Sequence, residues 1–360
     1  MTKQARITFG ILLCLLPTMV WANPTSPTAS EAGYCIDGSC GGRAPTSNML
    51  KLCEEMRSRA AWAQDWQCSN IAIYDQDDRR SITTNKDPKV DALSDVVGAG
   101  SVCNRTFTGT IVKRTNDDAD YVVLPAHSFF DRRGNPVLNK EGKSCSEAEM
   151  AQAQFYPNLK YLYMDEKLRD FAMRPSQIEW PPINLEAGKE WGTRGEDVLI
   201  FKLKPTNGKK LSEEIMPSGR QRGYAKYFVY SNSDVKISDF RNFARVSFHK
   251  DSARPLEQSY QTTNIQASAG NGMIYDTSDT WSIASGSPLV GEYAGQVGIL
   301  GHISTASGED SDAAAPVIKT QDVAHHRDYN RNISGNQIAQ KYNLESIRID
   351  GRMAALHKTQ

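Results

Sequence analysis

The stretch Ser282–Val290 reads Ser-Ile-Ala-Ser-Gly-Ser-Pro-Leu-Val, a turn of small residues that leads into an apolar, β-favouring segment. A turn of this kind can present a serine hydroxyl to a substrate. Serine, glycine and proline are also common in ordinary surface turns, because they tolerate the backbone angles that turns require. A serine hydroxyl is a weak nucleophile unless a neighbouring base takes its proton. The stretch therefore indicates serine chemistry only if the chain also supplies a base and an acid.

Two upstream segments supply these groups, each next to a predicted strand. His127 follows the run 121–124 just past its end, and Asp197 begins the run 197–201. Histidine, with an ordinary pKa near 6.5, is the usual general base close to neutral pH. Taken singly, such a histidine is more often a surface or capping residue, and such an aspartate is more often a strand-edge carboxylate. The order His127, Asp197, Ser285, each joined to a strand, is what favours a catalytic set.

The composition and the N-terminal sequence limit the classes of protein to which the chain can belong. Basic and acidic residues number 42 each, so the overall charge indicates no nucleic-acid partner, and 39% hydrophobic residues are typical of a globular chain. Lys3 and Arg6 precede the apolar run Ile7–Trp21, which predicts a secretory signal peptide over residues 1–22. The run is shorter than the roughly 20 residues that span a bilayer, so we expect no stable membrane anchor. The mature chain is predicted to be secreted, into a periplasm or the medium.

Cysteine usage agrees with export. Cleavage of the signal peptide removes one of the seven cysteines, and the even number that remains predicts three disulfides in an oxidising compartment. No Cys-x-x-Cys motif or histidine cluster accompanies them, so the sequence implies neither a metal nor another cofactor. The six cysteines are Cys35, Cys40, Cys53, Cys68, Cys103 and Cys145.

A predicted helix restricts their pairing. Apolar residues recur at helical spacing over about 48–66, and a continuous helix would hold Cys53 about 20 Å from the cysteine just past its end, too far for a bridge. The pairing that we expect joins Cys53 and Cys68 to Cys35 and Cys40, in an order left open, and leaves Cys103 with Cys145.

The chain divides into segments that differ in composition and in hydrophobic pattern. Residues 75–94 are charged and poor in large apolar side chains, which predicts a linker or processing region. We therefore expect 23–95 to be a small, disulfide-stapled helical module with a linker, and a candidate prosegment. From Val96 the pattern changes to short β-favouring runs between turns, which predicts an all-β barrel or sandwich. These runs are 106–112, 120–124, 197–201, 227–230, 244–248, 289–290 and 296–300. Residues 335–342 predict a short C-terminal helix, and the tail 344–360 is charged.

Three of these segments carry a family resemblance. They are Thr108–Val112 with 121–127, then 196–203, and then 275–280 leading into 285–290. They resemble, in order, the glycine strand with the alanine-histidine motif, the aspartate strand and the nucleophile loop of the chymotrypsin-like (trypsin-like) serine peptidases. The exported bacterial branch that includes glutamyl and lysyl endopeptidases is the most similar. The resemblance implies a double six-stranded antiparallel β-barrel over 96–343.

Carried over position by position, the resemblance assigns roles. It makes Ser285 the nucleophile, His127 the base and Asp197 the residue that orients the base. The backbone N–H groups of Ile283 and Ser285 would form the oxyanion hole. The implied reaction is endopeptidase cleavage of protein or peptide substrates through an acyl-enzyme.

The resemblance also indicates substrate-binding residues. Asp279 occupies the place of the acid that selects Lys or Arg in trypsin, with Thr280 beside it, which favours a basic substrate residue. His302 falls in the strand that would line the substrate groove.

Some positions depart from the family pattern. Ile283 replaces a glycine two residues before the nucleophile, Ala284 lacks an acid that pairs with a new N-terminus, and Gly301 stands where many members place a serine that bonds the catalytic aspartate. These departures leave a second hypothesis open, a catalytically weak or inactive homologue that acts as a secreted binding or adhesion protein. A third is a β-rich structural protein in which the motif residues are incidental. The natural substrate and the oligomeric state are not determined by the sequence.

Overall fold

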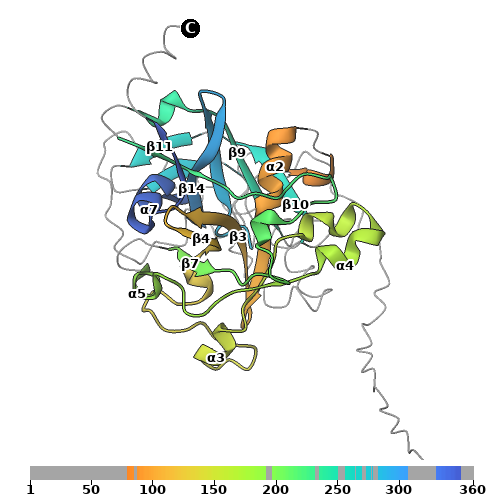
Figure 1. The fold of residues 1–360 in the computed structure, drawn as a ribbon. Helices are drawn as coiled ribbons and strands as arrows, with labels where there is room; N and C mark the ends of the chain where they lie inside the picture. The colour runs from red at the N-terminus through yellow and green to blue at the C-terminus, as the bar shows by residue number, and fades with distance from the viewer. Residues whose placement is uncertain are drawn as a thin grey trace, which may run out of the picture. The chain divides into compact units, whose positions relative to one another are not determined.

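The computed structural model describes residues 79–84, 87–191, 197–231, 235–249, 256–263, 265–269, 273–276, 278, 283–306 and 330–349. The predicted signal peptide, the module between Cys35 and Cys68, the pair Asp279 and Thr280, and most of the charged tail lie outside the described residues. The described chain is mostly β, with few helices (Figure 1). None of its helices is long and apolar enough to cross a membrane.

Six strands from residues 97–202 form one antiparallel sheet in the order β6-β5-β2-β3-β4-β7. Its two ends meet, because Ile178 and Leu203, which follow β6 and β7, form a bridge. On either side of that bridge, Glu179 N–H donates to the carbonyl of Lys202 at 2.8 Å and Lys204 N–H donates to that of Gln177 at 3.0 Å. The sheet is therefore curled on itself. The strands are β2 (Val97–Val102), β3 (Arg105–Arg114), β4 (Asp117–Leu124), β5 (Gln154–Tyr156), β6 (Ser176–Gln177) and β7 (Leu199–Lys202).

A second sheet contains ten strands among the described residues, which differs from the six predicted. Its main path runs β1-β10-β9-β13-β14-β15-β12-β11, and β8 joins it by pairing in parallel with β14 and with the C-terminal β16. The strands are β1 (Arg80–Ser81), β8 (Tyr227–Tyr230), β9 (Arg241–Phe248), β10 (Gln258–Thr262), β11 (Ile265–Ala269), β12 (Met273–Asp276), β13 (Pro288–Tyr293), β14 (Gln296–Ala306), β15 (Asn330–Ser334) and β16 (Ser346–Ile349). All seven strand-forming runs predicted above fall within or overlap strands of the two sheets.

Both sheets contribute to one hydrophobic core. Phe107 and Val122 from the first sheet belong to the same buried cluster as Val246 and Ile299 from the second, and each is 0% exposed. Because strand side chains alternate between faces, the buried face of each sheet is its apolar one. The same cluster includes Ile283, so the turn that carries the candidate nucleophile is packed into the core.

The segment predicted as a linker contains a helix, α2 (Pro88–Val96), coloured orange in Figure 1. Its N-terminus is capped by the carboxylate of Asp87, which accepts from the N–H of Lys89 at 2.8 Å, and a proline occupies its first turn. Both features stabilise a helix start. The structure therefore differs from the linker predicted for 75–94, and α2 runs directly into β2.

Buried charges attach the end of α2 to the rest of the fold. Asp95 is 0% exposed and forms ion pairs with Lys160 and Arg220, while Lys160 also donates to Ser94 Oγ at 2.8 Å. A buried carboxylate is tolerated only when it is paired in this way. The predicted boundary at residue 95 thus falls at a point where the chain is built into the described fold.

The remaining helices are short, and the C-terminal one is as predicted. Helix α7 covers Gly335–Tyr342, which confirms the prediction for 335–342. Cys103, after β2, is bonded to Cys145, before α3, which confirms that pairing. The other helical segments are η2 (Ile82–Thr84), η3 (Ala126–Ser128), α3 (Glu147–Met150), η4 (Leu159–Tyr163), η5 (Glu166–Leu168), α4 (Arg169–Ala172), α5 (Leu185–Lys189), η6 (Leu211–Glu213) and η7 (Ile237–Asp239).

Candidate active site

The antiparallel pairing of β4 and β7 brings His127 and Asp197 together. Leu124, the last residue of β4, lies opposite Leu199, the first of β7, so the chain after β4 and the chain before β7 meet at one end of the sheet. His127 Nδ1 lies 2.6 Å from Asp197 Oδ2, and the backbone N–H of His127 donates to Asp197 Oδ1 at 2.8 Å. Because an ionised carboxylate only accepts, Nδ1 carries the proton. This leaves Nε2 as the ring nitrogen with basic character.

A third donor holds the same carboxylate. Asp197 is 3% exposed, and Ser304 Oγ in β14 donates to its Oδ2 at 2.5 Å. Sequence comparison placed this serine at position 301, where the chain has glycine. The structure corrects that register, because Gly301 pairs with Leu289 and the serine that contacts the aspartate is Ser304. The supposed loss of this hydrogen bond therefore does not count against activity.

The imidazole of His127 is partly open to solvent, with 25% of its side chain exposed. Trp191 stands against it edge-on, with the ring centroids 5.9 Å apart and an interplanar angle of 61°. The indole N–H of Trp191 donates to the carbonyl of Phe130 at 2.9 Å, which fixes the ring. No sequence signal marked Trp191, since its place beside His127 depends on how two distant segments pack.

The turn with Ser285 is docked onto the first sheet close to His127. The carbonyl of Ser285 accepts from Thr108 N–H in β3 at 3.0 Å, and Gly286 N–H donates to the carbonyl of Ile303 at 2.9 Å. Gly286 has a φ of +85°, and a Cβ there would lie 2.3 Å from Thr108 O and 2.5 Å from Pro125 Cδ. Only glycine fits such an approach. Gly286, the residue after Ser285, therefore lies against Pro125, and Pro125 precedes His127 by two positions.

Ile283, the predicted oxyanion-hole residue, has an unusual backbone conformation. Its φ is +76°, a left-handed value that a β-branched residue rarely adopts, and its side chain is 4% exposed. Within the described parts of the chain, the backbone N–H groups of Ile283 and Ser285 have no hydrogen-bond acceptor. Two such N–H groups are what an oxyanion hole requires.

A buried arginine, which sequence reasoning missed, supports both flanks of the turn. Arg245 in β9 is 0% exposed; its Nη2 lies 2.6 Å from Asp276 Oδ2, its Nε donates to Ser278 Oγ at 2.6 Å, and its Nη1 donates to the carbonyl of Ser287 at 3.0 Å. The only feature of the sequence that could have pointed to Arg245 was a charged residue inside the β-favouring run 244–248. Arg245 thus joins Asp276 and Ser278, which precede the turn, to Ser287 at its end.

His302 lies beneath the turn and away from solvent. It is 0% exposed, its Nδ1 lies 3.0 Å from the carbonyl of Gly286, and its Nε2 lies 2.6 Å from the hydroxyl of Tyr227. Burial lowers the pKa of His302 to about 4, although the hydrogen bond to Gly286 opposes that shift. With both ring nitrogens engaged inside the protein, His302 has none left for a substrate side chain in this structure, in contrast to the groove position predicted for it.

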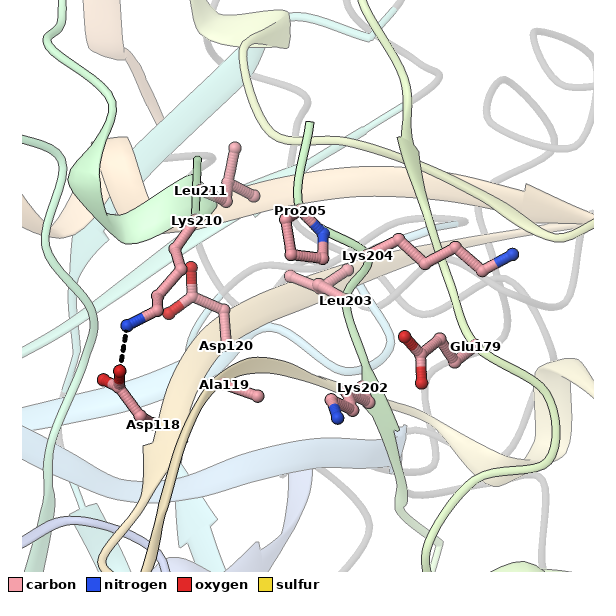
Figure 2. Close-up of a pocket in the computed structure, with 10 residues that line it drawn as sticks. All are labelled: Asp118, Ala119, Asp120, Glu179, Lys202, Leu203, Lys204, Pro205, Lys210 and Leu211. Carbon is pink, nitrogen blue, oxygen red and sulfur yellow. Dashed lines mark hydrogen bonds and ion pairs between the residues drawn. The ribbon is translucent and has the colours of Figure 1, made fainter. Parts of the chain in front are cut away.

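A separate hollow of about 270 Å³ lies at the opposite end of β4 and β7. Figure 2 shows its lining, which mixes acidic and basic side chains and includes an ion pair between Asp118 and Lys210. Four strand residues, Tyr121–Leu124, separate its lining at Asp120 from the turn that carries His127, about 13 Å at 3.3 Å per residue, and the lining includes neither His127 nor Asp197. The hollow is therefore not part of the His127 site. No group of three or more metal-ligating side chains gathers among the residues described.

Comparisons with known proteins returned structural neighbours only. No protein-family model matches the chain, and no curated protein matches it. Similar solved structures include the thermostable serine protease AL20 from an extremophilic microorganism (13% identity, TM-score 0.44, 70% of this chain and 97% of that one). Others are the protease Anisep from Arthrobacter nicotinovorans (12%, 0.43, 72% and 96%) and an inactive form of the Rv3671c protease (11%, 0.36, 70% and 90%). Likeness at these identities and TM-scores identifies neither a family nor a substrate.

Proposed function

We propose that the protein is a secreted serine endopeptidase with Ser285 as nucleophile, His127 as general base and Asp197 as the residue that orients the base. The observation that carries the proposal is the double contact between His127 and Asp197, at 2.6 and 2.8 Å. A carboxylate that is buried and bonded to both the ring and the backbone of one histidine holds a single ring orientation. Such an arrangement is expected of a catalytic pair and is not needed in a histidine that merely caps a turn.

In the proposed reaction Ser285 Oγ forms a bond to the scissile carbonyl carbon while His127 Nε2 accepts the hydroxyl proton. The tetrahedral intermediate then collapses, the C–N bond breaks, and His127 passes the proton to the leaving amine. Water attacks the resulting ester with His127 again as base, and the carboxylic acid product leaves. Asp197 keeps Nδ1 protonated and stabilises the imidazolium that forms in each step.

The negative oxygen of the intermediate would be bound by the N–H groups of Ile283 and Ser285. The glycine that the resemblance places at position 283 provides conformational freedom and no functional group. Ile283 has a positive φ, +76°, of the kind glycine adopts freely. An N–H in that conformation can serve the same purpose, so an isoleucine at this position is compatible with a working oxyanion hole.

The substrate class follows from the same proposal. We expect protein or peptide substrates, with a preference for Lys or Arg before the scissile bond through charge pairing with Asp279. Equal cleavage of matched peptides with and without a basic residue at that position would exclude this preference.

Labelling with a fluorophosphonate probe tests the function, because the probe forms a covalent bond only with an activated serine. We expect labelling of the purified protein that Ser285→Ala abolishes and Ser287→Ala retains. Ser287 is the control within the same turn, since it is 0% exposed and its hydroxyl accepts from Arg245 Nη1 at 3.1 Å. Asp197→Asn should reduce the labelling rate by about 10³ to 10⁴ while the fold is kept, because the histidine loses its orienting charge.

One observation favours a second function, a weakly active or inactive homologue that binds a partner. A β-branched residue at φ +76° stores strain, and relaxation of Ile283 would remove one donor of the oxyanion hole. Absence of labelling in a folded sample, shown by a cooperative unfolding transition, would favour this alternative.

A further inference from the structure

Thr108 in β3 connects the first sheet to the candidate nucleophile turn. It is 0% exposed, its Oγ1 donates to the carbonyl of Ile283 at 2.6 Å, and its N–H donates to the carbonyl of Ser285 at 3.0 Å. Its Oγ1 also accepts from the N–H of Phe248 in β9 at 3.4 Å. One residue thus binds the carbonyls on both sides of Ala284, and it is itself held by the second sheet.

The conformation of Ile283 needs such a partner. An isoleucine with φ near +76° would relieve its strain by returning to negative φ, a rotation of roughly 130° about the N–Cα bond. That rotation changes the direction of the Ile283 N–H relative to the Ile283 carbonyl. Thr108 holds the carbonyl side of this bond through the carbonyls of Ile283 and Ser285, so the relaxation cannot move that side without breaking a buried hydrogen bond and can proceed only by moving the chain before Ile283.

We propose that Thr108 is a positioning residue that keeps the N–H of Ile283 directed at the oxyanion of the bound substrate. This inference rests on the proposed peptidase function and adds to it the group that maintains the oxyanion hole. Thr108 touches no reacting atom. It acts through the backbone of Ile283. A glycine at position 283 would adopt the positive φ without strain, whereas the isoleucine needs the hydrogen bond from the Thr108 hydroxyl to keep it.

The strand offers a matched control. Thr110 lies two residues further along β3, is also 0% exposed, and its Oγ1 has no hydrogen-bond partner within the described chain. Thr→Val at either site removes one buried hydroxyl and keeps the shape of the side chain. Only at Thr108 does the change remove a hydrogen bond to the turn.

The experiment measures inactivation by a fluorophosphonate, separated into the limiting rate kinact and the binding constant KI. For Thr108→Val we expect kinact to fall about tenfold with KI unchanged, since the lost contact acts on the transition state. Thr108→Ser, which keeps the donor, should restore most of the rate. Thr110→Val should react like the wild type, and Thr108→Ala, which lacks the same donor, should be as slow as Thr108→Val.

Two results would overturn the inference while the proposed function stands: wild-type kinact in Thr108→Val, or an equal loss in Thr108→Val and Thr110→Val. A slow Thr108→Ser would do the same, because loss of packing and not of the hydroxyl would then be responsible. If the folded wild type is not labelled at all, the proposed function itself fails and the inference falls with it.

Discussion

The strained backbone of Ile283 should reverse the usual order of stability between a glycine variant and an alanine variant at this position. A protein with glycine at a buried position is normally less stable than the same protein with alanine there, because glycine loses more backbone freedom on folding. At φ +76° alanine keeps the steric penalty of a left-handed backbone and glycine does not. We therefore expect Ile283→Gly to be at least as stable as Ile283→Ala. Both variants lose the packing of the isoleucine side chain, about 2–5 kcal/mol, so that this large contribution cancels in the comparison.

The size of the effect can be isolated with a second pair of variants. Ile299 in β14 is 0% exposed and lies in a strand of ordinary negative φ. There the glycine variant should be less stable than the alanine variant by about 0.5–1 kcal/mol. The left-handed penalty is about 1–2 kcal/mol, so the glycine-minus-alanine difference at position 283 should exceed that at position 299 by this amount.

Urea unfolding of the four variants at one pH, followed by tryptophan fluorescence, gives these differences directly. If glycine is disfavoured at position 283 as much as at position 299, Ile283 is not strained and the reasoning is refuted. Under the proposed function, Ile283→Gly should also be labelled by the fluorophosphonate at least as fast as the wild type, because no strain then opposes the open oxyanion hole.

Three further predictions follow from the site and the fold. Ser304→Ala removes a buried donor to Asp197 and should lower kinact about tenfold; an unchanged rate would mean that His127 alone positions the carboxylate. Burial lowers the pKa of His302 to about 4, so between pH 6.5 and 4 the unfolded chain binds a proton that the folded chain does not. The stability that the neutral, buried His302 contributes is therefore complete above pH 6.5, and up to about 3 kcal/mol of it is lost as the pH falls toward 4. Urea unfolding of His302→Gln should show a weaker pH dependence over this range. Replacing both Cys103 and Cys145 by serine opens a loop with a sequence separation of 42 and should lower the free energy of unfolding by about 4 kcal/mol, measured against the oxidised protein; equal stability would show that this bridge restrains the unfolded chain little.

Local sequence patterns predicted the local structure well. The run 106–112 lies inside β3, 227–230 is β8, and 335–342 is α7. Alternation of side chains and helical spacing are properties of neighbouring residues, so they can be read without knowing the fold. The exception is α2, in which four polar residues are interspersed with four apolar ones and hide the helical pattern, although Asp87 and Pro88 mark its start.

Errors arose where the register of a strand decides which way a side chain points. Gly301 and Ser304 lie in the same strand, and the pairing of β14 with β15 shifts between Ile303 and Thr305. A shift of one residue exchanges the two faces of a strand. Comparison of residue types cannot detect such a shift, which is why the partner of Asp197 was misplaced. His302 precedes the shift, and its burial depends on how β14 packs beneath the turn at Gly286.

The sequence by itself determined which residues are available for chemistry and in what order: a histidine after one strand, an aspartate before another, and a serine in a tight turn. Only the tertiary structure decided which of them meet and what holds them. The contact between His127 and Asp197 depends on the pairing of β4 with β7, and the hold of Thr108 on Ile283 joins residues 175 positions apart. The physical reason is that hydrogen bonds over such separations depend on how the two sheets pack, and short-range patterns in the chain carry no information on that packing.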